Sequence, residues 1–312
     1  MGALIEGRWT SDDELLRNGE FDRKPTSFRR RIAADGEFAA ESGRYHLYVS
    51  LACPWASRTL VVRKLKQLEE VISVTNVHPD MLENGWTFGG KPEPVNGFSF
   101  LYQAYQAADP LYSGRVTVPV LWDKRTRTIV NNESAEIIRM LNREFDAWGD
   151  ASVDLFPRAL AQEIDALNAK VYETVNNGVY RAGFATSQAA YDSAVLALFA
   201  TLEELEQRLA DRRYLFGLRL TEADVRLFTT GVRFDLVYYS HFKCNVKQWR
   251  DFPNLFGWLK DVYQLPGVDQ TVDLGEIKRH YYRSMRWVNP SGIVPAGPTI
   301  DLRAPHERQR LG

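Results

Sequence analysis

The sequence predicts an α/β domain followed by an all-α domain, and three observations support this. A chain of 312 residues is long for one hydrophobic core and suits two. Short β-branched runs alternate with helical periodicity before about residue 150, whereas helical spacing dominates afterwards. We therefore expect four parts, namely an N-terminal arm over 1–40, an α/β domain over 41–150, a helical domain over 151–285 and an extended C-terminal tail over 286–312.

Composition and charge narrow the class of protein. With 45% hydrophobic and 25% charged residues, the chain has the composition of a soluble globular protein. A formal net charge of -1 predicts no broad basic surface, so we expect neither nucleic acid nor a membrane as a main partner. No apolar run approaches the length needed to cross a bilayer.

Two cysteines, Cys53 and Cys244, are too few for a disulfide framework in a chain of this size. Neither has a cysteine or histidine at the spacing of a metal finger, so no metal site is expected. A reducing, cytoplasmic location is the simplest inference. No role is assigned to Cys244, because no helix-start signal surrounds it.

The arm is polar, with Phe21, Phe28 and Ile32 interleaved among charged residues. This pattern predicts a segment that docks on the body of the protein through its apolar side chains. The Arg29–Arg31 cluster is interpreted as a solvated face, since the net charge gives little support to a nucleic-acid site.

The segment from Tyr45 to Leu60 predicts a strand, a short loop and a helix, with Cys53 at the helix start. Pro54 is suited to the first helical turn, where its missing N–H costs nothing. The helix N-terminus stabilises an anion there, so Cys53 is a candidate reactive thiolate; the alternative is a small buried apolar residue. Because the second cysteine of a Cys-x-x-Cys pair is absent, any redox partner sulfur comes from elsewhere, such as a small thiol.

A second strand is predicted over Val71–Val77, parallel to the first by the crossover rule. A long stretch rich in Gly, Pro and aromatic residues then runs from His78 to Arg115. Long loops in compact domains are usually functional or disordered. Trp86 in this stretch has two interpretations, a residue that covers a ligand or an anchor that packs the loop.

Two further strands are predicted over Val116–Asp123 and Thr128–Asn131. A proline inside a strand lies at an edge, a bulge or a special turn. After a strand, cysteine and helix unit, Val118-Pro119 suggests the cis-proline of thioredoxin-like folds, while an ordinary trans edge proline is the alternative. Glu133 and Ser134 are then expected in the first turn of another helix, either as caps or as ligands for an α-amino acid head group.

Cys53-Pro54, Val118-Pro119 and Glu133-Ser134 together resemble the glutathione site of the glutathione transferase superfamily. The second half agrees with this resemblance, because segments 159–174, 188–209 and 256–263 have helical periodicity. Thr221 to Asp224 matches the capping box that opens a buried helix in that superfamily, which is a structural feature. The resemblance implies a thioredoxin-like N-terminal domain followed by a helical glutathione-transferase C-terminal domain.

Within that superfamily the chain is most similar to the xi class, the glutathionyl-hydroquinone reductases. The Trp86 loop and three tyrosine segments, around Tyr180, Tyr238 and Tyr281, carry this similarity. One departure is Met285, where members of the class often have a histidine. That departure bears on the acceptor pocket or the C-terminal packing.

The resemblance implies glutathione as cosubstrate and a glutathionyl-hydroquinone or quinone as the second small molecule. Cys53 is the implied nucleophile, with the phenols of Tyr180, Tyr238 and Tyr281 facing the hydroquinone oxygens. The implied glutathione-binding residues are Trp86, Arg115, Val118, Pro119, Glu133 and Ser134. A homodimer is expected from the family.

Two alternative functions remain open. An omega-like thioltransferase or dehydroascorbate reductase shares Cys53, Pro119, Glu133 and Ser134, but gives no reason for the three tyrosine segments. A non-catalytic binding module with the same two-domain fold needs no reactive Cys53, since fold does not determine function.

Overall fold

The computed structural model describes residues 2–11, 16–17, 20–21 and 26–311. By their contacts these residues form two units. The unit that we call the α/β unit takes the described residues of 1–14, 24–153 and 275–284, and the helical unit takes those of 15–23, 154–274 and 285–312. The four-part division drawn from the sequence stays a prediction.

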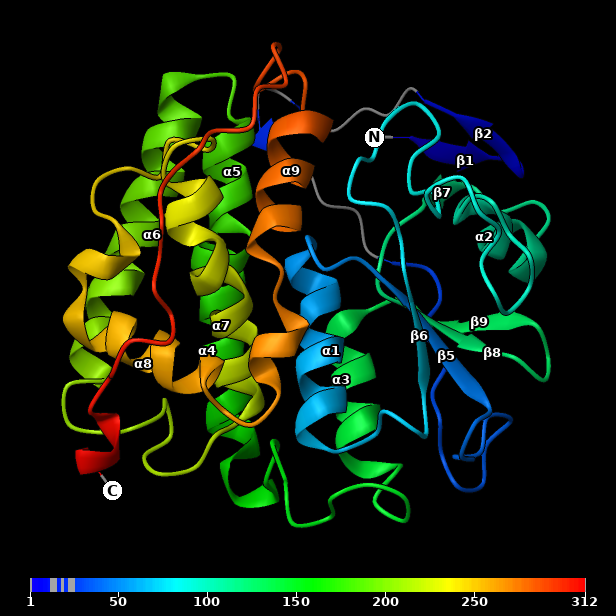
Figure 1. Cartoon of the computed structure of the whole chain (residues 1–312), viewed down its shortest axis with the longest axis horizontal. Helices are drawn as coiled ribbons and strands as arrows, with labels where there is room; N and C mark the ends of the chain where they lie inside the picture. The colour runs from blue at the N-terminus through cyan, green and yellow to red at the C-terminus, as the bar shows by residue number, and fades with distance from the viewer. Residues whose placement is uncertain (1, 12–15, 18–19, 22–25, 312) are drawn as a thin grey trace. The chain divides into compact units, whose positions relative to one another are not determined.

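A four-stranded sheet organises the α/β unit. Its strands are β5 (Tyr45–Val49), β6 (Ser73–Asn76), β8 (Val120–Asp123) and β9 (Thr128–Asn131), in the order β6-β5-β8-β9. β5 and β6 run parallel, as the crossover rule predicts, whereas β8 is antiparallel to both β5 and β9. The helices α1 (Pro54–Leu65) and α3 (Ser134–Arg143) pack against each other beside this sheet (Figure 1). This is the expected thioredoxin-like arrangement.

Sequence reasoning missed a small sheet and one helix of this unit. β1 (Ala3–Ile5), β2 (Arg8–Thr10) and β7 (Gly114–Arg115) pair antiparallel, and α2 (Tyr102–Ala108) packs on β9. Strands of two or three residues are too short to show a period, and seven residues barely complete two helical turns. The stretch from 78 to 115 is therefore more structured than the predicted loop.

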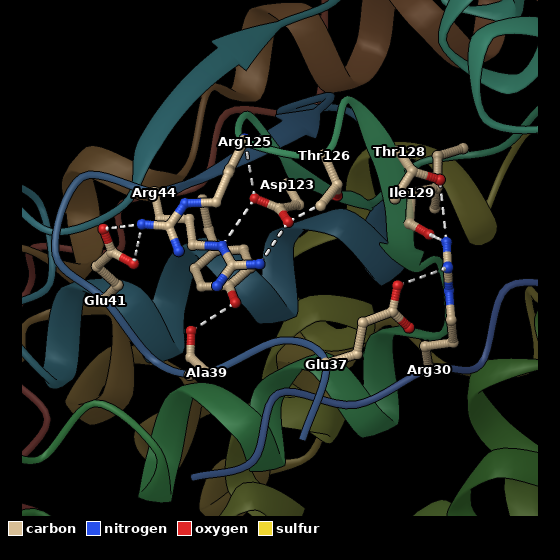
Figure 2. A network of polar contacts seen from close by, with 11 residues as sticks. Arg30, Glu37, Ala39, Glu41, Arg44, Asp123, Arg125, Thr126, Thr128 and Ile129 are labelled. Atoms are coloured by element: carbon tan, nitrogen blue, oxygen red, sulfur yellow. Dashed lines mark hydrogen bonds and ion pairs between the residues drawn. The ribbon is translucent and has the colours of Figure 1, made fainter. Parts of the chain in front are cut away.

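Two arginines, Arg30 of the arm and Arg44 after it, bind the chain that precedes β5 to the sheet (Figure 2). The Arg44 guanidinium donates two hydrogen bonds, of 2.9 and 2.7 Å, to the buried Asp123 carboxylate. Arg30 donates to the Thr128 hydroxyl at 3.0 Å and to a backbone carbonyl of β9 at 2.6 Å. The arm is thus held by the buried side chains of Ile32 and Phe38 and also by charged side chains. The sequence predicted only the apolar contacts.

The strands β3 (Leu16–Arg17) and β4 (Glu20–Phe21) form a separate two-stranded sheet. The side chain of Phe21 and residues 22–25 lie outside the described residues. Their predicted part in docking the arm stays a prediction.

The helical unit is built from α4 (Ala161–Val171), α5 (Gly178–Phe184), α6 (Gln188–Arg208), α7 (Glu222–Arg233) and α8 (Pro253–Tyr263). α9 (Leu274–Ser284) falls almost entirely in the α/β unit by its contacts. The helix predicted over 188–209 is confirmed, and the one predicted over 256–263 begins earlier, at Pro253. No helix among the described residues is both long enough and apolar enough to span a membrane.

The helix predicted over 159–174 ends as an α-helix at Val171, because a π-helical turn, η2 (Tyr172–Asn176), follows it. A second π-helical turn, η3 (Phe234–Tyr238), continues α7. Short 3₁₀ turns occupy 158–160, 249–251, 268–271 and 308–311. The predicted capping box is confirmed, since Asp224 accepts from the Thr221 backbone N–H at 2.9 Å.

The C-terminal tail packs on the helical unit. Arg308 is buried, and its guanidinium donates to several backbone carbonyls, including those of Leu209 at 2.9 Å and Asn254 at 3.3 Å. The side chains of Lys260 in α8 and of Gln264, the C-cap of this helix, donate hydrogen bonds to backbone carbonyls of the tail. These contacts bind residues 302–308 to the helices α6 and α8.

Candidate active site

Cys53 is the N-cap of α1, where the sequence places it. Its backbone is extended (φ -80°, ψ 121°) while its carbonyl already accepts from the Ser57 N–H at 2.9 Å, and Pro54 follows at the first helical position. The side chain is partly exposed. A sulfur at this position lies at the positive end of the helix dipole, which favours a thiolate.

The peptide bond between Val118 and Pro119 is cis, so the cis interpretation is confirmed. This bond lies directly before β8, and the Cys53 Sγ atom is 3.7 Å from the Val118 carbonyl oxygen, within reach of a weak S–H hydrogen bond. The structure therefore brings two of the predicted site residues together, although they lie 65 positions apart.

Glu133 is the N-cap of α3, so the prediction that it lies in the first turn is wrong by one residue. The Glu133 N–H donates to Asn131 Oδ1 at 2.7 Å. This side-chain bond holds the chain before Ser134 in a non-helical conformation, so α3 begins only after Glu133. The Glu133 carboxylate accepts from the Ala135 N–H at 3.1 Å and from the Ser134 hydroxyl at 3.4 Å. The capping interpretation is confirmed, and the ligand interpretation stays a prediction.

Sequence reasoning missed Arg58, which joins the two helix starts. It is 1% exposed on α1, and its Nη1 atom donates to the Ser134 hydroxyl at 3.3 Å. Its guanidinium also lies over the Trp55 ring, 4.5 Å from the centroid. The signal in the sequence that could have identified Arg58 is a charged residue at a position on the apolar face of a short helix. Arg58 places a buried positive charge beside the Ser134 hydroxyl.

Trp86 is 6% exposed and stacks on His280 of α9, with ring centroids 4.9 Å apart and planes at 18°. The His280 Nδ1 atom in turn lies 2.7 Å from the Pro79 carbonyl oxygen. The packing interpretation of Trp86 thus has an identified partner. Arg115 is partly exposed in β7. Contact of either side chain with a ligand stays a prediction.

The helical unit brings two of the three predicted tyrosines together. Tyr180 of α5 and Tyr238 of η3 have ring centroids 5.9 Å apart, and both rings contact Phe242. Tyr281 belongs to the α/β unit, where it is 1% exposed and lies edge-on to His280. That all three phenols meet one aromatic ligand stays a prediction.

Both π-helical turns border this tyrosine pair, and the sequence did not reveal them. η2 ends shortly before α5, and the Asn176 amide from η2 donates to the Thr230 hydroxyl of α7 at 2.8 Å. Tyr238 is the last residue of η3. A π turn adds one residue to an otherwise continuous helix, so the apolar pattern barely changes. Such turns occur frequently at functional sites.

Cys244 lies next to the tyrosine pair, since its N–H donates to the Tyr238 carbonyl at 2.9 Å. It is fully buried, with its Sγ atom 3.9 Å from the Val179 carbonyl oxygen, and burial raises the pKa of its thiol far above the ordinary value. Among the described residues no group of three or more His, Cys, Asp or Glu side chains is arranged to hold a metal ion.

Family models match both halves of the chain. The model described as glutathione S-transferase, N-terminal domain, matches residues 52–144, and that described as glutathione S-transferase, C-terminal domain, matches 188–261. The chain is 55% identical to glutathionyl-hydroquinone reductase YqjG of Escherichia coli, over 99% of this chain and 98% of that one. It is 51% identical to glutathionyl-hydroquinone reductase PcpF of Sphingobium chlorophenolicum, over 97% and 98%.

Solved structures agree with these sequence relatives. The glutathione-bound structure of YqjG superposes with a TM-score of 0.91 at 54% identity, covering 99% of both chains. A Xi class glutathione transferase from Natrialba magadii superposes with a TM-score of 0.94 at 48% identity, covering 99% of this chain and 97% of that one. The predicted fold class is confirmed. This chain therefore belongs to the glutathione transferase family and, within it, to the Xi class with the glutathionyl-hydroquinone reductases.

Proposed function

We propose that this protein uses glutathione to reduce glutathionyl-hydroquinones to hydroquinones, with Cys53 as the nucleophile. One observation carries the proposal: the Cys53 sulfur lies at the N-cap of α1, beside the carbonyl that precedes a cis-proline. The relatives named as glutathionyl-hydroquinone reductases supply the substrate class. The glutathione-bound relative supports glutathione as cosubstrate.

In the first step the Cys53 thiolate attacks the sulfur that joins glutathione to the ring. A sulfur–sulfur bond forms and the sulfur–carbon bond breaks, so the electron pair passes to the ring carbon. That carbon takes up a proton, which gives the free hydroquinone and leaves Cys53 as a mixed disulfide with glutathione.

In the second step the thiolate of another glutathione attacks the glutathionyl sulfur of this mixed disulfide. Glutathione disulfide leaves, and Cys53 returns to its thiolate. Over both steps the ring is reduced by two electrons and two glutathionyl groups are oxidised to one disulfide. No second protein cysteine is required, which agrees with the Cys53-Pro54-Trp55-Ala56 sequence.

Glutathione is held, in this proposal, by residues of the α/β unit. The backbone of Val118, next to Pro119, pairs with the cysteinyl part of glutathione. Glu133 and Ser134 at the start of α3 bind the γ-glutamyl head, because the carboxylate attracts its ammonium group while N–H donors of the helix end attract its carboxylate. Trp86 and Arg115 bind the glycyl end.

The phenols of Tyr180, Tyr238 and Tyr281 face the hydroquinone oxygens in this proposal. They orient the ring and assist the proton transfer to carbon. The Tyr180 and Tyr238 rings pack directly on each other, 5.9 Å apart between centroids, so these two phenols belong to one aromatic cluster.

The test is turnover of glutathionyl-menadiol with excess glutathione. We expect menadiol and glutathione disulfide in equal amounts from the wild type and none from Cys53→Ala. Mass spectrometry of wild type mixed with substrate, before glutathione is added, should show one glutathionyl group on Cys53. Hydroquinone release without that intermediate would overturn the mechanism.

The same assay separates the alternative functions. A wild type that left glutathionyl-menadiol intact but reduced a simple glutathione mixed disulfide would be an omega-like thioltransferase. A wild type inactive toward both, with a Cys53 of ordinary reactivity, would be a binding module.

A homodimer and a cytoplasmic location complete the proposal. The resemblance to the Xi class supports the dimer, and the presence of two thiols without a disulfide supports a reducing compartment. Light scattering coupled to gel filtration tests the first, since a mass near 35.7 kDa would exclude the dimer.

A further inference from the structure

The hydroxyl of Tyr105 connects two segments that are distant in sequence. Tyr105 lies on α2 and is fully buried. Its hydroxyl donates to the Thr117 carbonyl at 2.8 Å and accepts from the Thr117 N–H at 3.2 Å. The same oxygen accepts from the Asn132 side-chain amide at 3.1 Å. A single phenol therefore holds Thr117 and Asn132 together.

These two residues precede the segments to which binding of the cysteinyl and γ-glutamyl parts of glutathione is assigned. Thr117 is followed by Val118 and the cis-proline, and Asn132 is followed by Glu133 at the start of α3. The ladder between β8 and β9 ends on this side at the pair Leu121 and Asn131. Tyr105 supplies a link beyond the end of that ladder.

The surroundings of Tyr105 make this link stiff. Its ring packs edge-on against Phe28, at 5.7 Å between centroids, and lies tilted against the Tyr112 ring, at 5.2 Å. The backbone carbonyl of Phe28 also accepts a hydrogen bond from the Asn132 N–H at 3.1 Å. Burial raises the pKa of Tyr105 to about 12, so the hydroxyl keeps its proton and remains a donor at neutral pH.

The Asn132 side chain also depends on this phenol. The Asn132 side chain is 4% exposed, and its Oδ1 atom has no hydrogen-bond partner among the described residues. The amide contact with Tyr105 is therefore what orients the side chain that precedes Glu133.

We propose that Tyr105 is a positioning residue for glutathione, whose hydroxyl sets the spacing between the Val118 segment and the Glu133 segment. This inference rests on the proposed function, because it takes both segments to bind the same glutathione molecule. Glutathione spans the two segments with its cysteinyl and γ-glutamyl parts, so a change in their spacing weakens binding. Cys53 is the N-cap of α1, and its backbone bonds to Ser50 and Ser57, so it keeps its reactivity although its sulfur is 3.7 Å from the Val118 carbonyl.

The test compares Tyr105→Phe with Tyr45→Phe. Tyr45 is also fully buried in the α/β unit, and its hydroxyl donates to the Ala39 carbonyl at 2.6 Å, so the control loses one buried phenol hydroxyl as well. Calorimetric titration with glutathione should show Kd raised about five- to tenfold by Tyr105→Phe and less than about twofold by Tyr45→Phe. Alkylation of Cys53 by iodoacetamide, without glutathione, should change less than about threefold in either variant.

The turnover assay adds a second readout. With saturating glutathionyl-menadiol, Tyr105→Phe should raise KM for glutathione while kcat at saturating glutathione stays within about twofold of the wild type. An unchanged Kd in Tyr105→Phe, or an equal rise in Tyr45→Phe, would overturn the inference. Since Kd is measured without the hydroquinone, an inactive wild type would count against the proposed function alone.

Asn132→Ala covers the case in which Tyr105→Phe does not fold. This variant removes the hydrogen bond from the Asn132 amide to the Tyr105 hydroxyl and leaves the phenol bonded to Thr117. We therefore expect Kd for glutathione to rise about two- to fourfold. In the double variant the Asn132 change should add little to the Tyr105 change, because both remove the same contact. Fully additive effects, or no effect of Asn132→Ala, would contradict the positioning role.

Discussion

Cys53 and Cys244 are the same residue in two opposite surroundings. Cys53 lies at a helix N-cap with its side chain partly exposed, and its sulfur is 3.7 Å from the carbonyl before the cis-proline. Cys244 is fully buried near backbone carbonyls of its own unit, and burial raises the pKa of its thiol. The first environment favours the thiolate and admits a substrate, whereas the second disfavours the charge.

This difference shows that position, rather than residue type, makes a cysteine reactive. A buried thiol contributes by packing and behaves as a small apolar residue. The predictions below test this contrast, beginning with the largest expected effect.

Replacing each sulfur by oxygen should separate the two cysteines by function. We expect Cys53→Ser to lower kcat with glutathionyl-menadiol by at least about a thousandfold, because a serine hydroxyl is not ionised at neutral pH and forms no mixed disulfide. Cys244→Ser should remain within about threefold of wild type, since that sulfur takes no part in the chemistry. A loss of comparable size in both variants would contradict the contrast.

Iodoacetamide should discriminate between the cysteines in the folded protein. We expect Cys53 to be alkylated at least about a hundredfold faster than Cys244, because a buried thiol reacts only after local opening. Peptide mass spectrometry at timed intervals gives both rates in one sample. In urea the two rates should converge, and a Cys244 that reacts rapidly without denaturant would contradict its buried position.

Tyr238→Phe tests whether a phenol of the helical unit, which also contains Cys244, acts on the hydroquinone ring. The phenol faces the hydroquinone oxygens in our proposal, so kcat with glutathionyl-menadiol should fall about tenfold. Reduction of an aliphatic glutathione mixed disulfide should change less than about twofold, since that substrate has no phenol to orient. Tyr214→Phe, another buried tyrosine of the helical unit, is the control. Equal losses on both substrates would point to a structural role.

Cys244→Ala should affect stability and not chemistry. At pH 7 we expect the free energy of unfolding to fall by about 1 kcal/mol through lost packing. The folded thiol has a raised pKa, so its stabilisation is complete below the ordinary value of 9.0 and is lost as the pH rises above that value. The wild type should therefore lose about 1 kcal/mol relative to Cys244→Ala between pH 9 and pH 10. Urea unfolding at pH 7, 9 and 10 measures this difference.

The longer elements were predictable because local rules decide them. The segment from Tyr45 to Leu60 shows alternation, then Pro54 at a helix start, then helical spacing, and each signal lies within a few residues of its effect. The Thr221 capping box is equally local. The N-cap position of Cys53 follows from the same rules.

Other features depend on residues that are distant in sequence. Arg58 meets Ser134 only because α1 packs on α3, and Trp86 meets His280 only because residues 275–284 join the α/β unit. The link from Tyr105 to Asn132 likewise needs α2 to pack on β9. No local pattern carries such information, since each partner is consistent with many neighbours.

The sequence alone determined the two-part organisation, the helix starts at Cys53 and near Glu133, and the types of side chain available for thiol chemistry. The tertiary structure decided which of these groups touch, which thiol stays exposed, and how the phenols of Tyr180 and Tyr238 pair. The physical reason is that capping and periodicity act over one or two turns, whereas burial and side-chain contact depend on the packing of whole elements.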